Sequence, residues 1–283
     1  MPFFRHPFVA GQFYEANAEA LKLQISSCFL SNLGPKKLPK VNFCNHPRKI
    51  VGLISPHAGY MYSGTVAASG FFELAKDGLP DTVIILGPNH TGYGSGLSLM
   101  REGSWRTPLG DIQVDTELAD IMLSKTDIID VDETSHRFEH SIEVQLPFLQ
   151  YLYGNKFKFV PICFLRQDYV SAIEVGNTLV NVLAARNVVV IASSDMTHYE
   201  HAKQAEKKDC QAIHAITALD VPQFYETVET QNITICGYAP IAALITYSKG
   251  LNAKANLQNY HNSGDVSGDY TSIVGYASLL FTK

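Results

Sequence analysis

Histidines follow three apolar segments of the chain, each at the point where the segment ends. The stretches are "SPHAGY" with His57, "GPNH" with His90, and "SSDMTHY" with Asp195 and His198. Imidazole is the commonest metal ligand in proteins, and two histidines with one anionic group make an open site for iron, zinc or copper. Metal binding is therefore the chemistry that these residue types indicate.

The segments that precede these histidines are predicted to be buried β-strands. Residues 50–54, 81–86 and 187–192 are continuous apolar runs, which are typical of strands covered on both faces. Helical patterns lie between them, and this alternation predicts an α/β fold with a central, mainly parallel or mixed sheet covered by helices. Ligands bind outside the carboxyl ends of parallel strands, so His57, His90 and His198 are expected to share one edge.

The third metal ligand is open between Asp195, a glutamate and Cys236. The stretch "TICGYAP" places Cys236 just before a helix predicted to begin near residue 239. A helix N-terminus stabilises a thiolate, which would make this cysteine a competent ligand. On spacing alone, the simpler interpretation is favoured, in which Cys236 is a small buried apolar residue next to a turn glycine.

The stretch "HRFEHSIEVQLPFL" holds a second polar cluster. Residues 139–153 are predicted to form a helix that Pro147 kinks or restarts. His140 and Glu143 are three residues apart and would share one helical face, where they could move protons beside the strand ends. The alternative places Glu139 at the positive end of the helix and leaves His140 exposed, and without other information this alternative is favoured.

Asp195 and His198 are also three residues apart. Asp195 could orient the His198 ring through a hydrogen bond, or it could simply cap a helix, and the sequence does not separate these two readings. Near the N-terminus, "AGQFYEA" could place aromatic rings over the site, although core packing is the expected role.

Composition excludes several classes of protein. The chain has 283 residues, a net charge of −5 and no long Lys/Arg tract, which argues against nucleic-acid binding. Its apolar runs are far shorter than the ~20 residues of a membrane span, and the first residues lack a secretory signal, so a cytoplasmic protein is expected. No convincing linker divides the chain, which predicts one domain over residues 1–283.

The cysteines do not form a recognisable framework. There are five, they are widely spaced, and no CxxC occurs, which argues against disulfides and zinc fingers. Cys28 and Cys163 lie in apolar stretches and are expected to be buried and inert. Cys210 is expected on a helix, and Cys44 lies in a predicted loop rich in Pro, Lys and Asn.

Taken in order, several stretches resemble one family. "AGQFY", "SPHAGYMYSG", "ILGPNHTG", "WRTPLGDIQVD", "EHSIEVQLPFLQ", "SSDMTHY", "TICGYAPI" and "VGYASLLF" are similar to the Memo family, from about Pro7 to the C-terminus. The compact prokaryotic members are the most similar. This family is similar in fold to class III extradiol (LigB-like) dioxygenases, which are non-haem iron enzymes with two histidine ligands and one carboxylate ligand.

The resemblance implies roles for particular residues. His57 and His90 match the two histidine ligands, and Cys236 matches the position of the carboxylate. A thiolate there makes copper or a redox role more plausible and puts dioxygenase activity in doubt. His198 matches an acid–base histidine, with Asp195 beside it. Animal members are associated with phosphotyrosine peptides, and that role is not carried over to this chain.

Three functions follow from these expectations. The first is a metal-dependent oxidoreductase with iron or copper on His57, His90 and Cys236, in which His198 and His140 move protons and Asp195 orients His198. The second is a binding protein whose strand-end cleft holds a small molecule or peptide without catalysis. The third, a zinc hydrolase, ranks last because a thiolate ligand does not suit that pattern.

Overall fold

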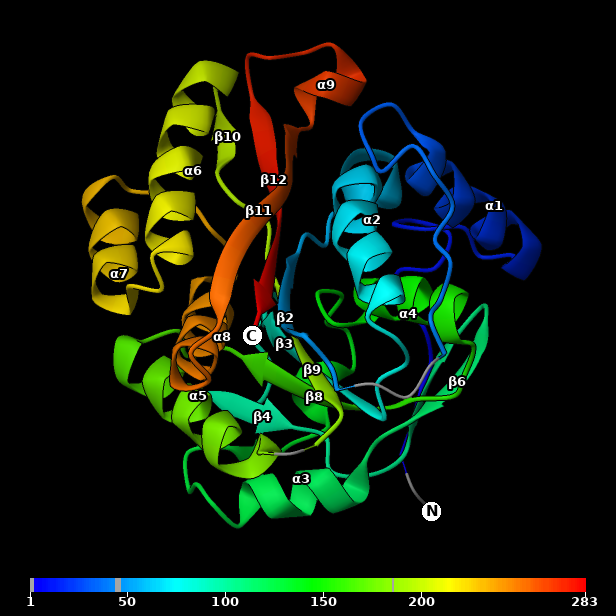
Figure 1. The fold of residues 1–283 in the computed structure, drawn as a ribbon, viewed down its shortest axis with the longest axis vertical. Helices are drawn as coiled ribbons and strands as arrows, with labels where there is room; N and C mark the ends of the chain where they lie inside the picture. Colours follow the sequence, from blue (N-terminus) through cyan, green and yellow to red (C-terminus); the bar gives the residue numbers. More distant parts are fainter. Residues whose placement is uncertain (1–2, 44–46, 185) are drawn as a thin grey trace.

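Four parallel strands form the centre of a mixed β-sheet (Figure 1). The computed structural model describes residues 3–43, 47–184 and 186–283. In the sheet, β2 (Ile50–Ser55) pairs with β9 (Val188–Ser193), β9 with β3 (Thr82–Pro88), and β3 with β8 (Lys158–Phe164). The three predicted strands are thus adjacent and parallel, and their carboxyl ends meet at one edge.

Antiparallel strands extend this centre on both sides. On one side β12 (Ile273–Thr282) pairs with β2, and β11 (Lys254–Asn262) and β10 (His198–Glu200) pair with β12. On the other side lie β4 (Leu97–Leu99) and β7 (Asp130–Val131). A separate small sheet holds β1 (Phe4–Arg5), β5 (Ser104–Thr107) and β6 (Gly110–Gln113). The last two strands pair as an antiparallel hairpin.

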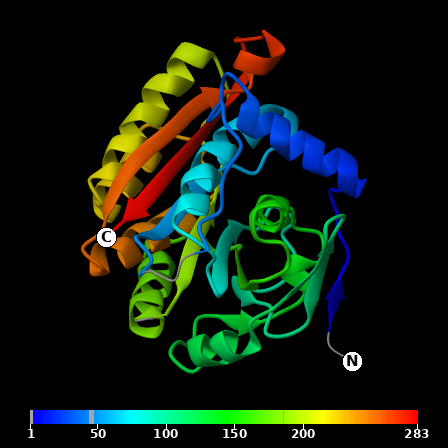
Figure 2. The same ribbon diagram turned by 45° about the vertical axis from the view of Figure 1, so that its right-hand side comes forward.

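Helices cover both faces of the sheet, which confirms the predicted α/β class (Figures 1 and 2). One group comprises α1 (Ala18–Leu30), α2 (Tyr60–Lys76) and α4 (Leu146–Tyr153). The other comprises α3 (Thr116–Leu123), α5 (Tyr169–Leu183), α6 (Ala202–Thr217), α7 (Val221–Thr230) and α8 (Tyr238–Gly250). Short turns of helix form η1 (Thr134–His136), η2 (Glu143–Gln145) and α9 (Gly264–Ser267). Within the described residues, no helix is long and apolar enough to cross a membrane.

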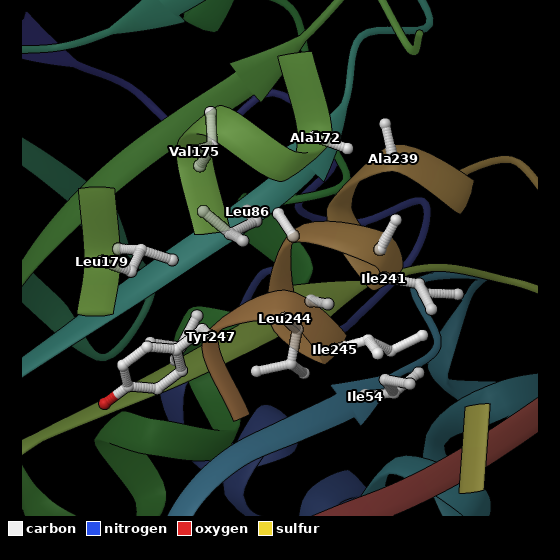
Figure 3. Close-up of a cluster of buried hydrophobic side chains, with 14 of the residues drawn as sticks. Ile54, Leu86, Ala172, Val175, Leu179, Ala239, Ile241, Leu244, Ile245 and Tyr247 are labelled. Carbon is white, nitrogen blue, oxygen red and sulfur yellow. The ribbon is translucent and has the colours of Figure 1, made fainter. Parts of the chain in front are cut away.

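Apolar packing joins the helices to the sheet. Figure 3 shows part of one buried cluster, to which α8 contributes Leu244 and Ile245, α5 contributes Val175 and Leu179, and the strands contribute Ile54 and Leu86. Each of these side chains is buried, and burying one such side chain contributes about 1.5–3 kcal/mol. Close packing against α5 and α8 therefore fixes the positions of the central strands.

The predicted positions of three other cysteines agree with the structure. Cys28 and Cys163 are buried, and Cys210 is exposed on α6. Cys44 lies outside the described residues.

The helix predicted over residues 139–153 is wrong in its first half. The α-helix begins only at Leu146, with Pro147 in its first turn, where a missing N–H costs nothing. Before it, the Glu139 carboxylate accepts the backbone N–H of Ser141 at 2.8 Å and holds this stretch in a non-helical turn. His140 and Glu143 consequently do not share the face of one helix.

Glu143 is buried and binds the N-terminal segment instead of entering the site. Its carboxylate forms an ion pair with Arg5 at 2.7 Å and accepts the backbone N–H groups of Phe8 and Val9 and the hydroxyl of Tyr14. Both partners of the ion pair are buried. The expectation that Glu143 serves as a proton acceptor beside the strand ends is therefore wrong, because four donors occupy its oxygens.

Arg5→Met tests the contribution of this ion pair. The variant leaves the Glu143 charge buried without its partner, so we expect the free energy of unfolding to fall by about 3–5 kcal/mol. Urea denaturation measures it. Arg106→Met is the matched control, because Arg106 forms an exposed ion pair with Asp111 and should leave stability unchanged. Equal stability of the two variants would contradict the role of Arg5.

The buried His136 should make the free energy of unfolding depend on pH. Burial lowers its pKa to about 3, against a value of about 6.5 in an unfolded chain. As the pH falls below 6.5, the unfolded state gains a proton that the folded state does not, so stability falls by up to about 1.4 kcal/mol per pH unit. His136→Leu should therefore show a shallower loss of stability between pH 7 and 5 in urea denaturation. An identical slope would contradict burial of a neutral imidazole.

Candidate metal centre

All six predicted site residues line one cavity of about 480 Å³ at the carboxyl edge of the sheet. His57 follows β2, His90 follows β3, and Asp195 follows β9. His198 begins β10, His140 comes from the turn before η2, and Cys236 precedes α8. The parallel pairing of β2, β9 and β3 brings the first three loops together, as expected for a sheet of this class.

His57, His90 and Cys236 come closest to forming a ligand set. One possible ligand atom of each residue lies within 4.8 Å of those of the other two. The Sγ atom of Cys236 is 3.2 Å from Nε2 of His57, and the His57 and His90 rings are 5.2 Å apart. Metal bonds of about 2.0–2.3 Å need donor atoms at nearly this spacing. The three donor atoms therefore lie close to the spacing that one ion would require.

The loop that carries Cys236 is held from two sides. Gln167 donates from Nε2 to the Cys236 carbonyl at 2.8 Å and accepts the N–H of Ala239 at 3.2 Å. The backbone N–H of Asp195 donates to Sγ at 3.1 Å. These contacts aim the sulfur atom at His57 and away from the apolar core.

Cys236 precedes the first residue of α8, as predicted, but the net pKa shift of its thiol is upward. Burial raises the pKa of the thiol above its usual value and outweighs the hydrogen bond from Asp195. Burial also lowers the pKa of His57, and the nearby histidines lower it further. Without a cation the two groups are consequently a neutral thiol and a neutral imidazole.

Glu139, which the sequence did not single out, orients His90. Nδ1 of His90 donates to the carboxylate at 2.9 Å, and the His90 backbone N–H donates to it as well. Although burial opposes ionisation, these bonds lower the pKa of Glu139 to about 2. The same hydrogen bond offsets burial and raises the pKa of His90. With Nδ1 occupied, neutral His90 offers Nε2 as its ligand atom.

His140 lies against His90, one of the candidate ligands. Its ring stacks on His90 at 4.6 Å and packs against Phe13 at 4.8 Å. Burial lowers its pKa to about 4, so it is neutral at pH 7 and able to accept a proton. Phe13 comes from "AGQFYEA" and lines the cavity, while Tyr14 of the same stretch is buried on Glu143.

A second possible ligand group consists of His90, Glu139 and His140. The Glu139 carboxylate already accepts N–H groups from His90 and Ser141. A metal ion would have to compete with these bonds, so the set with Cys236 is the better candidate.

The two readings of Asp195 are both wrong. Its carboxylate accepts the backbone N–H of His57 at 2.8 Å, and the strand β10 follows it instead of a helix. The His198 ring is oriented by Thr234, because Nδ1 donates to the Thr234 carbonyl at 2.8 Å. Asp195 therefore supports the His57 loop, and His198 keeps Nε2 as a proton acceptor.

Sequence comparison identifies the family. The family profile described as "Memo-like protein" matches residues 5–280. The chain belongs to the Memo-like protein family. A MEMO1 family protein of Methanopyrus kandleri is 50% identical over 99% of each chain. Members from Methanocaldococcus jannaschii and Sulfolobus acidocaldarius are 48% and 46% identical, each over 98% of this chain, and over 98% and 99% of their own lengths.

A solved structure shares the fold of this Memo-like chain. The crystal structure of an uncharacterized protein, JW3007, from Escherichia coli superposes with a TM-score of 0.54 at 13% sequence identity. The match covers 82% of this chain and 99% of the other. At this identity the likeness concerns the fold alone.

Gly237→Ala tests how closely the Cys236 loop must approach β9. A Cβ atom at residue 237 would lie 2.6 Å from the Ser193 carbonyl oxygen and 2.8 Å from Cβ of Ser194. Because backbone must move, we expect a loss of about 1–3 kcal/mol in urea denaturation. Gly96→Ala is the control, since its Cβ meets nothing closer than 3.4 Å. Equal stability of both variants would show that the close approach is not required.

Proposed function

We propose that this protein is an iron- or copper-dependent oxidoreductase whose metal ligands are His57, His90 and Cys236. The proposal is carried by one observation, which is that an imidazole nitrogen of each histidine and the Cys236 sulfur converge within 4.8 Å at the edge of a cavity. Two imidazoles and a thiolate suit iron, copper or zinc, and they leave positions open for a substrate.

The electrostatics of the pair formed by His57 and Cys236 fit a bound cation. Burial disfavours both the thiolate and the imidazolium. The Cys236 thiol would lose its proton when such an ion binds, and the positive charge of the ion would offset the cost of burying the thiolate. Its binding should therefore release a proton and strengthen as the pH rises.

The residues around the ligands would bind substrate and move protons. When bound, the metal ion supplies one-electron redox chemistry. His140 and the Nε2 atom of His198 are proton acceptors on the cavity wall. The ring of Phe13 and the exposed ring of Tyr199 are apolar surfaces for a small molecule. Zinc is the less favoured metal because a thiolate is uncommon among hydrolytic zinc ligands.

A second function is favoured by the cavity itself. Its volume of about 480 Å³ and its aromatic wall are features of ligand pockets. A protein that binds a small molecule or peptide there without catalysis would use the same residues, with any metal ion being structural or absent.

Metal content distinguishes the two functions. Protein purified without oxygen or an affinity tag should contain about one iron or copper per chain by mass spectrometry, and Cys236→Ser should lose most of it, since one ligand is removed. Cys210→Ser is the matched control, because that cysteine is exposed on α6 and should leave the metal content unchanged.

The opposite results have clear meanings. Absence of metal in all three proteins would move the assignment to ligand binding. Zinc alone, with hydrolysis indifferent to oxygen, would replace the redox proposal with the hydrolase. Metal retained in Cys236→Ser would remove Cys236 from the ligand set.

A further inference from the structure

A buried hydrogen-bond chain lies behind His57, on the side away from Cys236. Nδ1 of His57 is 2.9 Å from the hydroxyl oxygen of Ser193, the last residue of β9. The same hydroxyl lies 2.8 Å from Nε2 of Gln145 and 2.7 Å from the carbonyl oxygen of Ser141. All four residues are buried. In this series of hydrogen bonds, the neighbouring groups determine which atom of each pair is the donor.

The orientation of the Gln145 amide is set by backbone carbonyls. Its Nε2 atom lies 3.0 Å from the Pro56 carbonyl and 3.4 Å from the Ser55 carbonyl. Because carbonyl oxygens only accept hydrogen bonds, the amide atom that faces them must be the NH₂ group. Gln145 therefore donates its other N–H to the Ser193 hydroxyl.

Ser193 then has no hydrogen left for His57. A hydroxyl carries one hydrogen, and the Ser141 carbonyl, which can only accept, takes it. The Ser193 oxygen already accepts from Gln145, so toward His57 it can only accept again. Nδ1 of His57 must consequently carry the hydrogen. In a neutral imidazole, Nε2 then holds the lone pair, and this is the atom 3.2 Å from the Cys236 sulfur.

We propose that Ser193 and Gln145 are positioning residues that hold His57 as the Nδ1–H tautomer and present its Nε2 lone pair to the metal ion. The tautomer follows from the hydrogen bonds alone, whereas its use in metal binding rests on the proposed function. Glu139 has the same effect on His90 through a carboxylate. Different groups thus orient the two proposed histidine ligands. The Ser193 hydroxyl orients His57, and the buried Glu139 carboxylate orients His90.

Both supports converge on one short segment of the chain. Glu139 binds His90 directly, and the Ser141 carbonyl terminates the relay from His57. The N–H of Ser141 donates to Glu139, and its hydroxyl donates to the Pro88 carbonyl at the end of β3. A substitution in residues 139–141 would therefore alter the orientation of both His57 and His90. A substitution of Ser193 should alter that of His57 alone.

The tautomer is measurable in metal-free protein. Long-range ¹H–¹⁵N correlation spectra of ¹⁵N-histidine-labelled protein separate protonated from unprotonated ring nitrogens, and His57→Gln assigns the signal. We expect wild-type His57 to be a single Nδ1–H tautomer and Ser193→Ala to populate both tautomers. A wild-type ring protonated at Nε2, or an unchanged spectrum in Ser193→Ala, would overturn the inference whether or not the protein binds metal.

The affinity for a metal ion tests whether the orientation of His57 by Ser193 matters for metal binding. Titration with Co²⁺, followed by its visible absorption, should show Ser193→Ala binding about 10–100-fold more weakly than wild type, the usual effect of losing a group that orients a ligand. Ser248→Ala is the matched control, because Ser248 is a buried serine of α8 whose hydroxyl has no hydrogen-bond partner among the described residues. It should bind as tightly as wild type.

The outcomes separate the two proposals. If the wild-type protein does not bind Co²⁺, the proposed metal site is contradicted. The His57 tautomer seen in the NMR spectra then tests the hydrogen-bonding role of Ser193 by itself. If wild type binds and Ser193→Ala binds equally, the positioning role is overturned. Should Ser193→Ala not fold by circular dichroism, Gln145→Met replaces it, since it removes the donor and keeps the side-chain length. Equal Co²⁺ affinity in that variant would likewise overturn the role.

Discussion

The buried ion pair between Arg5 and Glu143 is the constraint on which the site depends. Arg5 also donates to the backbone carbonyls of His136 and Glu139, so one guanidinium holds the turn that precedes the site. Glu143 in turn binds the backbone of the N-terminal segment. Breaking a buried charge pair is strongly unfavourable, which gives this turn a single conformation. Residues more than 130 positions apart in sequence thus determine where Glu139 and Ser141 lie.

The turn orients the proposed ligands His57 and His90, and the sheet positions the loops that carry them. The parallel pairing of β2, β9 and β3 brings three loops to one edge, but it does not decide which nitrogen of each ring faces the cavity. Glu139 decides this for His90, and Ser193 decides it for His57. The geometry of metal sites commonly depends on such outer groups as much as on the ligands. Here, Glu139 belongs to residues 139–141, and Ser193 donates to the Ser141 carbonyl of the same segment.

Burial and charge act in opposite directions at the cavity. Burial keeps the Cys236 thiol and the His57 imidazole neutral, so a bound cation would displace only the thiol proton and would use the lone pair that His57 already offers. Glu139 stays ionised despite its burial because several N–H groups donate to it. The ionised Glu139 therefore lies behind His90 and beside the neutral His140, and its negative charge favours a bound cation over a bound anion.

Local sequence patterns, which are uninterrupted apolar runs and the polar loops after them, were enough to predict the α/β class, the central strands and the positions of His57, His90, Asp195 and His198 at their ends. The prediction was wrong for residues 139–145, where residues at helical spacing form a turn. It was also wrong for the hydrogen-bond partner of the His198 ring. The roles of Glu139, Glu143, Ser193 and Gln145 were decided only by the tertiary structure. Each acts through hydrogen bonds to residues distant in sequence, and such bonds leave no periodic signal in the chain.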